Sequence, residues 1–212
     1  MSVQTLFPTE TALAPAPRVQ QESLRHVLDD PSWDVADVPS PIGIFRIGYR
    51  GDHVMYVDLR ERGVEALPVS RADRPARAPF PEGSPPRQLQ EYFQGRRRGF
   101  DVSLDFLTGS AFDRKVWQAL SRIPYGSYRT YGEVARSVGT PQAARAVGGA
   151  AHRNPIPIVV PCHRLVGGDR SLTGFGLGLW RKRWLLEHEG AYPLAPVRPE
   201  QRPRGQRQGR LP

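Results

Sequence analysis

The sequence predicts an α+β protein, in which a small N-terminal α/β unit with an antiparallel sheet precedes a mainly helical C-terminal domain of winged-helix or helix-turn-helix type. Two strand-like stretches flank a Gly-Asp turn near residue 51, and two short segments with helix caps lie between residues 130 and 153. A length of 212 residues is enough for a sizeable core. The only cysteine excludes a disulfide framework and a cysteine-rich zinc site.

Residues 1–40 are rich in proline, alanine and acidic residues and show weak periodicity, so we expect an N-terminal extension that is partly mobile. The N-terminal α+β domain then covers residues 41–105. Within it, the stretches 42–49 and 53–61 are rich in β-branched and aromatic residues and are joined by Arg50-Gly51-Asp52. This pattern predicts a β-hairpin.

A loop rich in proline and arginine follows from Pro68 to Pro86. Residues 87–98 then predict a helix, because Leu89, Tyr92 and Phe93 have the i, i+3, i+4 spacing of one helical face.

The C-terminal domain covers residues 106–191 and carries stronger local signals. Ser110 and Asp113 have the spacing of a capping box, and the helix behind them must stop before Pro124. Thr130 and Glu133 form a full capping box at the start of a short helix that Gly139 closes.

A second short helix is expected directly afterwards, with Thr140 as its N-cap and Pro141 at its first position. It must end before Asn154-Pro155, because the residue that precedes a proline avoids the helical conformation. Two short helices joined by a glycine-containing turn predict a helix-turn-helix.

Residues 155–166 predict an extended segment, because three prolines exclude a helix and the middle of a sheet. A glycine- and serine-rich loop, 167–178, leads to a final helix over 179–189 that Gly190 closes. The tail, 192–212, is rich in arginine and proline and is expected to be a disordered basic tail.

Thirty basic residues face twenty-one acidic ones, for a net charge of +9. All but Lys115 and Lys182 of the basic residues are arginines. This excess favours an anionic partner, with nucleic acid first and a membrane surface second. No apolar run approaches the roughly 18 residues of a membrane span, and the N-terminus lacks the pattern of a secretory signal. We therefore expect a soluble, cytoplasmic protein. The five histidines show no metal-ligand spacing.

The single cysteine, Cys162, lies in the sequence Pro161-Cys162-His163-Arg164. A lone intracellular cysteine is most often a buried, inert residue. Here the flanking proline and the adjacent His163 favour a nucleophilic thiolate. Because neighbours in an extended chain point to opposite faces, a relay through water is expected, with Glu187 or Glu189 orienting the imidazole.

The chain resembles the O6-alkylguanine-DNA alkyltransferases, also called methylated-DNA–protein-cysteine methyltransferases. The resemblance covers residues ~105–190 in order and spacing, and the N-terminal half matches only loosely. It rests on the following stretches: 112–123, Tyr131-Gly-Glu-Val-Ala135, Ala143-Ala-Arg-Ala-Val-Gly-Gly149, Asn154-Pro-Ile-Pro157, Pro161-Cys-His-Arg164 and Trp184-Leu-Leu-Glu-His-Glu-Gly190.

The resemblance implies a suicidal DNA repair protein that takes the alkyl group of O6-alkylguanine, and also of O4-alkylthymine, onto Cys162 in a single turnover. His163 and a water would deprotonate the thiol, and Glu189 would hold His163. Tyr131 would help to flip the damaged nucleotide and donate a proton towards guanine N3. Arg145 would fill the space left in the duplex, a reasonable role because arginine can stack on bases.

The resemblance also implies a substrate pocket and a DNA-binding surface. Asn154 would tie the helix-turn-helix to the cysteine loop, Pro157 would line the pocket, and Leu165 and Gly176 would read the guanine edges through their backbone. Phe175 and Leu177 depart from the common pattern, and Leu177 is expected to place bulk near the alkyl end. Thr130, Ala144 and Gly148 would contact DNA. The partner would be double-stranded DNA bound by a monomer near the nucleoid, with no cofactor and no metal.

Three other functions are open on the sequence. A non-catalytic binder of alkylated DNA would share the architecture, but such relatives carry tryptophan where this chain has Cys162. A helix-turn-helix regulator would usually place polar base-reading side chains on its second helix, which is nearly bare here. A thiol hydrolase would need an oxyanion site, which the sequence does not show.

Overall fold

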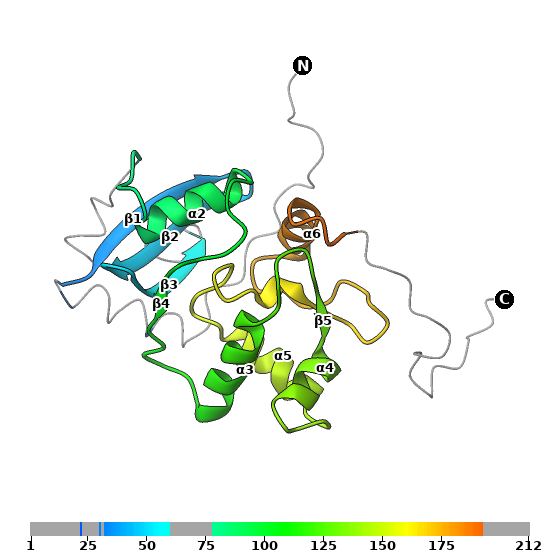
Figure 1. The fold of residues 1–212 in the computed structure, drawn as a ribbon. Helices are drawn as coiled ribbons and strands as arrows, with labels where there is room; N and C mark the ends of the chain where they lie inside the picture. Colours follow the sequence, from blue (N-terminus) through cyan, green and yellow to red (C-terminus); the bar gives the residue numbers. More distant parts are fainter. Residues whose placement is uncertain (1–21, 23–29, 31, 60–77, 193–212) are drawn as a thin grey trace, which may run out of the picture.

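The computed structural model describes residues 32–59 and 78–192, together with the single positions 22 and 30. Most of the predicted N-terminal extension, much of the proline-rich loop and the basic tail after Tyr192 lie outside these residues. The described chain forms a sheet covered by one helix, beside a cluster of helices and irregular segments (Figure 1).

The sheet has the strand order β1-β2-β3-β4. Strands β2 (Gly43–Arg50) and β3 (His53–Leu59) form an antiparallel hairpin, which confirms the predicted one. Its turn contains Gly51 at a φ of 59°, a left-handed conformation that glycine adopts without strain. The short β4 (Ser103–Leu104) pairs parallel to β3.

Strand β1 (Asp34–Ser40) was not predicted: these residues fall in the expected N-terminal extension, yet they pair along their full length with β2. The acidic residue that made the segment resemble coil is buried. Asp37 forms a two-fold hydrogen-bonded ion pair with Arg46 of β2, at 2.7 and 3.0 Å. A cross-strand pair of this kind stabilises a strand through its neighbour, so the local sequence does not show it.

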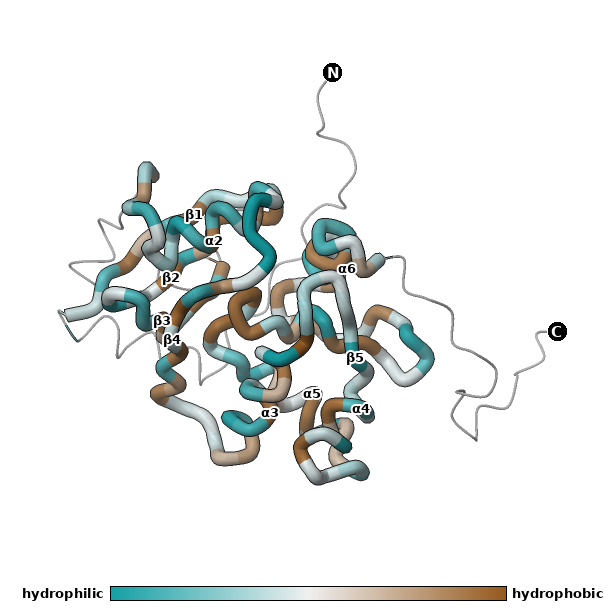
Figure 2. Tube along the Cα trace, in the orientation of Figure 1, coloured by the Kyte–Doolittle hydropathy of each residue, from teal (hydrophilic) through white to brown (hydrophobic). Residues whose placement is uncertain are grey.

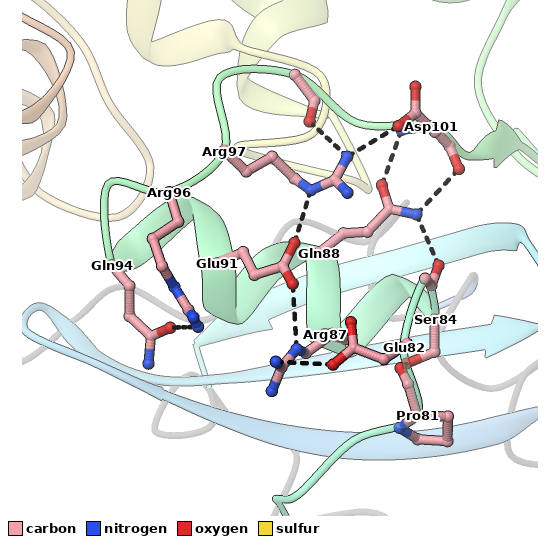
Figure 3. Close-up of polar contacts among 12 residues, drawn as sticks. Pro81, Glu82, Ser84, Arg87, Gln88, Glu91, Gln94, Arg96, Arg97 and Asp101 are labelled. Carbon is pink, nitrogen blue, oxygen red and sulfur yellow. Dashed lines mark hydrogen bonds and ion pairs between the residues drawn. The ribbon is translucent and has the colours of Figure 1, made fainter.

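Helix α2 (Pro85–Phe93) lies across β1 and β2 (Figure 1). The predicted helix covered residues 87–98, and α2 both begins and ends earlier than that. The chain turns at Gly95, whose φ is 71°. On its outer side Glu91 accepts hydrogen bonds from Arg87 and from Arg97, and Arg97 also contacts Asp101 (Figure 3). This network ties the helix to the segment that follows it.

Both predicted capping boxes are present in the C-terminal half. Ser110 and Asp113 cap α3 (Ala111–Ser121), and Thr130 and Glu133 cap α4 (Tyr131–Ser137). Each pair satisfies backbone N–H groups that a helix start leaves without partners.

Helix α5 (Ala144–His152) begins later than expected, and Thr140 is not its N-cap. Both the backbone N–H and the hydroxyl of Thr140 donate to the Ala135 carbonyl, at 2.9 and 3.4 Å. Thr140 therefore completes the end of α4, and residues 141–143 form a turn before α5.

The segment predicted as extended contains a turn of 3-10 helix, η3 (Cys162–Arg164), followed by β6 (Leu165–Val166). Strand β6 pairs parallel to β5 (Arg129–Thr130). The extended prediction is wrong at the cysteine, because the Arg164 N–H closes a tight turn onto the Pro161 carbonyl at 3.0 Å.

Helix α6 (Leu179–His188) has Glu189, the predicted last residue, as its C-cap, and Gly190 follows with a φ of 72°. Figure 2 shows hydrophobic and hydrophilic residues interleaved along α6 and the strands. The hydrophobic core is continuous, since one buried cluster contains residues of the sheet, of α2 and of the helical part. Hydrogen bonds also join the two halves: the Val57 N–H donates to the Pro155 carbonyl at 3.0 Å, and Arg181 Nε donates to the Ile42 carbonyl at 2.8 Å.

In the part of the chain that is described, no helix combines the length and the apolar character that crossing a bilayer requires.

Candidate active site

Cys162 opens the η3 turn and lies at the wall of a cavity of about 400 Å³. Cys162 is only 7% exposed, so its sulfur can be reached through this cavity and not from the open surface. The volume lies within the range of small-molecule sites. The cavity is lined by residues of α4, α5, η3 and the loop before α6: Tyr131, Gly148, Ala151, His152, Cys162, Gly174, Phe175 and Gly176.

The residue after the cysteine, His163, is fully buried and faces Glu189. Its Nε2 lies 2.9 Å from Glu189 Oε1. Spacing alone left Glu187 and Glu189 open as partners, and the resemblance implied Glu189. In the structure the carboxylate of Glu189 lies there. Glu187 instead lies on the exposed side of α6 and pairs with Arg183 at 2.8 Å.

Glu189 is a buried carboxylate surrounded by hydrogen-bond donors. Arg164 Nε donates to Oε2 and Arg164 Nη2 donates to Oε1, each at 2.8 Å. Tyr92, from α2, donates its hydroxyl proton to Oε1 at 2.7 Å. Burial alone would raise the pKa of the Glu189 carboxyl, but His163 and Arg164 hold it well below its usual value.

Because Glu189 is ionised, the proton of a neutral His163 ring belongs on Nε2, where it is donated to the carboxylate. The other ring nitrogen, Nδ1, is buried and has no hydrogen-bond partner among the described residues. Nδ1 is therefore the nitrogen that can accept a proton. The sequence expectation of a relay between Cys162 and His163 requires such a nitrogen.

Burial acts on the two reacting groups in opposite directions. It raises the pKa of the Cys162 thiol and lowers the pKa of the His163 imidazole, because both charged forms lose solvation. Near neutral pH the resting pair is thus an uncharged thiol beside an uncharged imidazole. A hydrogen bond from Asn154 and the charge of Lys182 act against burial and favour the thiolate.

Lys182 is one of the residues of this site that the sequence reasoning missed. Its side chain is buried, its Nζ donates to the carbonyls of Thr173 and Gly174, and burial lowers its pKa to about 8. The available signal was indirect: Lys182 is one of two lysines in a chain whose other basic residues are arginines. Its spacing along α6 does not reveal which residue it faces.

Tyr131, at the first position of α4, lines the cavity opposite the cysteine loop. Its hydroxyl donates to the same two carbonyls as Lys182, at 3.2 Å to Thr173 and 3.3 Å to Gly174. The ring of Tyr131 lies against Gly148, where an added Cβ would meet Cε1 at 3.7 Å.

Of the predicted pocket residues, Phe175 and Gly176 line the cavity, whereas Asn154, Pro157, Leu165 and Leu177 are buried behind its wall. Asn154 donates to the Val160 carbonyl at 2.9 Å and accepts from the Ile156 N–H at 3.0 Å, and so holds the loop before the cysteine. Leu177 belongs to the hydrophobic core. Ala151 and His152, at the end of α5, line the cavity although the sequence did not single them out.

Three of the four predicted DNA-contacting residues lie at helix starts. Arg145 is exposed in the first turn of α5, next to the partly exposed Ala144. Thr130 caps α4 immediately before Tyr131. Gly148 lies one turn of α5 further on than Ala144, within the cavity wall. Across the described residues no cluster of histidine, cysteine and carboxylate side chains has the geometry of a metal site.

The chain is similar to known proteins. Residues 111–191 match the family model described as the DNA binding domain of 6-O-methylguanine DNA methyltransferase. A methylated-DNA–protein-cysteine methyltransferase of Methanosarcina acetivorans is 43% identical over 72% of this chain and 95% of its own length. One of Mycolicibacterium paratuberculosis is 46% identical over 72% of this chain and 89% of its own.

The fold agrees with solved structures as well. The crystal structure of the O6-methylguanine methyltransferase of Mycobacterium tuberculosis superimposes with a TM-score of 0.62 at 40% identity, covering 75% of this chain and 93% of that one. A crystal structure of the same organism's protein in complex with DNA gives 0.62 at 42% identity, over 74% and 93% of the two chains. The chain therefore belongs to the methylated-DNA–protein-cysteine methyltransferase family.

Proposed function

We propose that this protein repairs DNA by moving an alkyl group from O6 of guanine in a duplex onto Sγ of Cys162. The observation that carries the proposal is a single buried thiol that opens into a cavity and is followed directly by the His163–Glu189 pair. A cavity of about 400 Å³ has room for an extrahelical base but not for a duplex. The nucleotide must therefore leave the base stack, which costs a few kcal/mol.

In the reaction the bond between the alkyl carbon and guanine O6 breaks, and a bond between that carbon and Sγ forms. The thiol proton passes through a water to Nδ1 of His163, whose Nε2–H is held by Glu189. The electron pair left on O6 is neutralised by a proton delivered to the purine, with Tyr131 as the donor towards N3. Lys182 favours the thiolate through its charge.

Because a thioether is a poor leaving group, each molecule acts once. Arg145, exposed at the start of α5, would enter the duplex in place of the flipped nucleotide. Ala144, Gly148 and Thr130 would contact the DNA backbone, and Phe175 and Gly176 would contact the base. The protein would act as a monomer on chromosomal DNA, with O4-alkylthymine as a second substrate.

The direct test is intact-protein mass spectrometry after incubation with duplex DNA that contains O6-methylguanine. The wild type is expected to gain one methyl group per molecule, and Cys162→Ala none, with duplex binding preserved. Loss of the lesion in the presence of Cys162→Ala would contradict the proposal, whereas duplex binding by the wild type without any mass gain would identify a non-catalytic binder.

A second comparison separates flipping from chemistry. Arg145→Ala is expected to slow repair of duplex DNA strongly and to leave the reaction with the free base O6-benzylguanine nearly unchanged, since a free base needs no flipping. Arg136→Ala, an exposed arginine of α4, is the matched control for loss of one surface charge. Equal losses on both substrates would remove the flipping role from Arg145.

A further inference from the structure

The N-terminal unit reaches into the active site through one side chain, Tyr92. Tyr92 lies in α2, and its side chain is fully buried. Its hydroxyl donates to Glu189 Oε1 at 2.7 Å, across a sequence separation of 97 residues. The carboxylate that holds His163 is therefore bound from both halves of the chain.

The hydroxyl contacts the same carboxylate oxygen as the imidazole. Oε1 of Glu189 lies 2.9 Å from His163 Nε2, 2.8 Å from Arg164 Nη2 and 2.7 Å from the Tyr92 hydroxyl. Hydrogen bonds to an ionised acceptor are short and strong, and several of them fix its orientation. Burial, then the negative charge of Glu189, raises the pKa of Tyr92 well above its usual value, so the phenol stays protonated and remains a donor.

Tyr92 cannot turn away from this position without displacing its neighbours. Its backbone carbonyl lies 2.7 Å from His188 Nε2, and the two rings pack edge to face with centroids 5.4 Å apart. His188 directly precedes Glu189. The residue before Tyr92, Glu91, belongs to the Glu91–Arg97–Asp101 network, which holds the helix and the following segment together (Figure 3).

We propose that Tyr92 is a positioning residue for alkyl transfer. By donating to Glu189 Oε1, it orients the carboxylate towards Nε2 of His163. The same hydrogen bond reduces the negative charge on Oε1 next to the imidazole. The N-terminal unit then contributes to the chemistry as well as to the fold. This inference rests on the proposed function, because Tyr92 acts only through the Glu189–His163 pair.

The charge argument gives the direction of the effect. His163 is faced by the charged groups of Glu189, Arg164 and Lys182. Removing the phenol proton donor leaves more negative charge at Oε1, which stabilises the imidazolium and raises the pKa of His163. Since the resting pair is uncharged, the acid limb of the rate profile follows His163, and its midpoint is expected to move to higher pH.

The test compares Tyr92→Phe with the wild type in single-turnover methyl transfer from duplex DNA, over a series of pH values and DNA concentrations. We expect the saturating rate at pH 7 to fall about fivefold or more, the acid midpoint to rise by about half a pH unit, and the affinity for DNA to stay the same. The matched control is Tyr125→Phe, which removes a hydroxyl that donates to the His188 carbonyl at 3.0 Å and not to the Glu189 carboxylate.

Iodoacetamide labelling of Cys162 against pH, in the absence of DNA, supplies a readout that does not depend on repair. If the wild type transfers no methyl group, the proposed function is wrong. The pH midpoint of iodoacetamide labelling then tests the role of Tyr92 by itself. Tyr92 is not a positioning residue if Tyr92→Phe matches Tyr125→Phe in the rate of methyl transfer, in the acid midpoint of that rate and in the pH midpoint of labelling. Thermal unfolding must show that both variants are folded. A fall in DNA affinity with an unchanged saturating rate would also overturn the proposal.

Discussion

Replacing Glu189 by glutamine is a severe test of the buried cluster, because every neighbour of this carboxylate is a donor. Arg164, His163 and Tyr92 all direct protons at its two oxygens. Glutamine has nearly the same shape but turns one oxygen into an NH₂ group. At least one donor then faces another donor, and the Arg164 guanidinium, whose side chain is 8% exposed, loses its counter-ion.

The magnitude follows from this burial. Removing one partner of a buried ion pair costs about 3–5 kcal/mol, because the remaining charge is left without compensation. The carbonyl of Ile123 also accepts from Arg164, at 2.5 Å, but it is a neutral acceptor and replaces only part of the loss. For a chain of this size such a loss lowers the midpoint of thermal unfolding by roughly 10 °C.

The assay is urea unfolding followed by circular dichroism at pH 7, with Glu187→Gln as the matched control. Glu187 lies two residues earlier, its side chain is 44% exposed, and it pairs with Arg183 of the same helix. An exposed i, i+4 pair contributes about 0.3–0.5 kcal/mol, so the control is expected to be nearly neutral. The reasoning is refuted if Glu189→Gln costs less than about 1 kcal/mol or no more than Glu187→Gln.

Three further predictions concern acid stability, one glycine and the buried lysine. Because the folded pKa of Glu189 is depressed, its contribution to stability is complete above the unfolded pKa of about 4.3 and declines as pH falls below it. Urea midpoints of the wild type and Glu189→Gln should therefore converge in acid, and a constant difference would contradict this. Gly109→Ala should cost about 2 kcal/mol or more in the same assay, since a Cβ there would lie 2.4 Å from the Trp117 ring at a φ of 91°; a neutral substitution would refute the clash. Lys182→Met should raise the pKa of Cys162 and move iodoacetamide labelling to higher pH, because a positive charge that lowers this pKa is removed; an unmoved profile would show that Lys182 only packs.

Features that depend on residues close together in the chain could be predicted. The two capping boxes join residues three apart, and the hairpin depends on the Gly51-Asp52 turn between two strand-like stretches. In each case the interacting groups are brought together by the local backbone alone. The lone thiol and its adjacent histidine were likewise visible without a structure.

Features that depend on residues far apart in the chain could not be predicted from the sequence. Strand β1 is stable because it pairs with β2 and buries the Asp37–Arg46 ion pair. The η3 turn at Cys162 depends on how the loop packs against α3 and α6. Helix periodicity left Glu187 and Glu189 as alternatives, since it says nothing of where His163 lies.

By itself, the sequence determined the hairpin, the capped starts of α3 and α4, the one available nucleophile and the family to which the chain belongs. Only the tertiary structure decided which charges surround that nucleophile. Lys182 and Tyr92 reach the site from a buried helix face and from the other half of the chain. The physical reason is that burial and electrostatic interaction depend on distance in space, and the pKa values of Cys162, His163 and Glu189 are set by groups that the chain brings together only when it is folded.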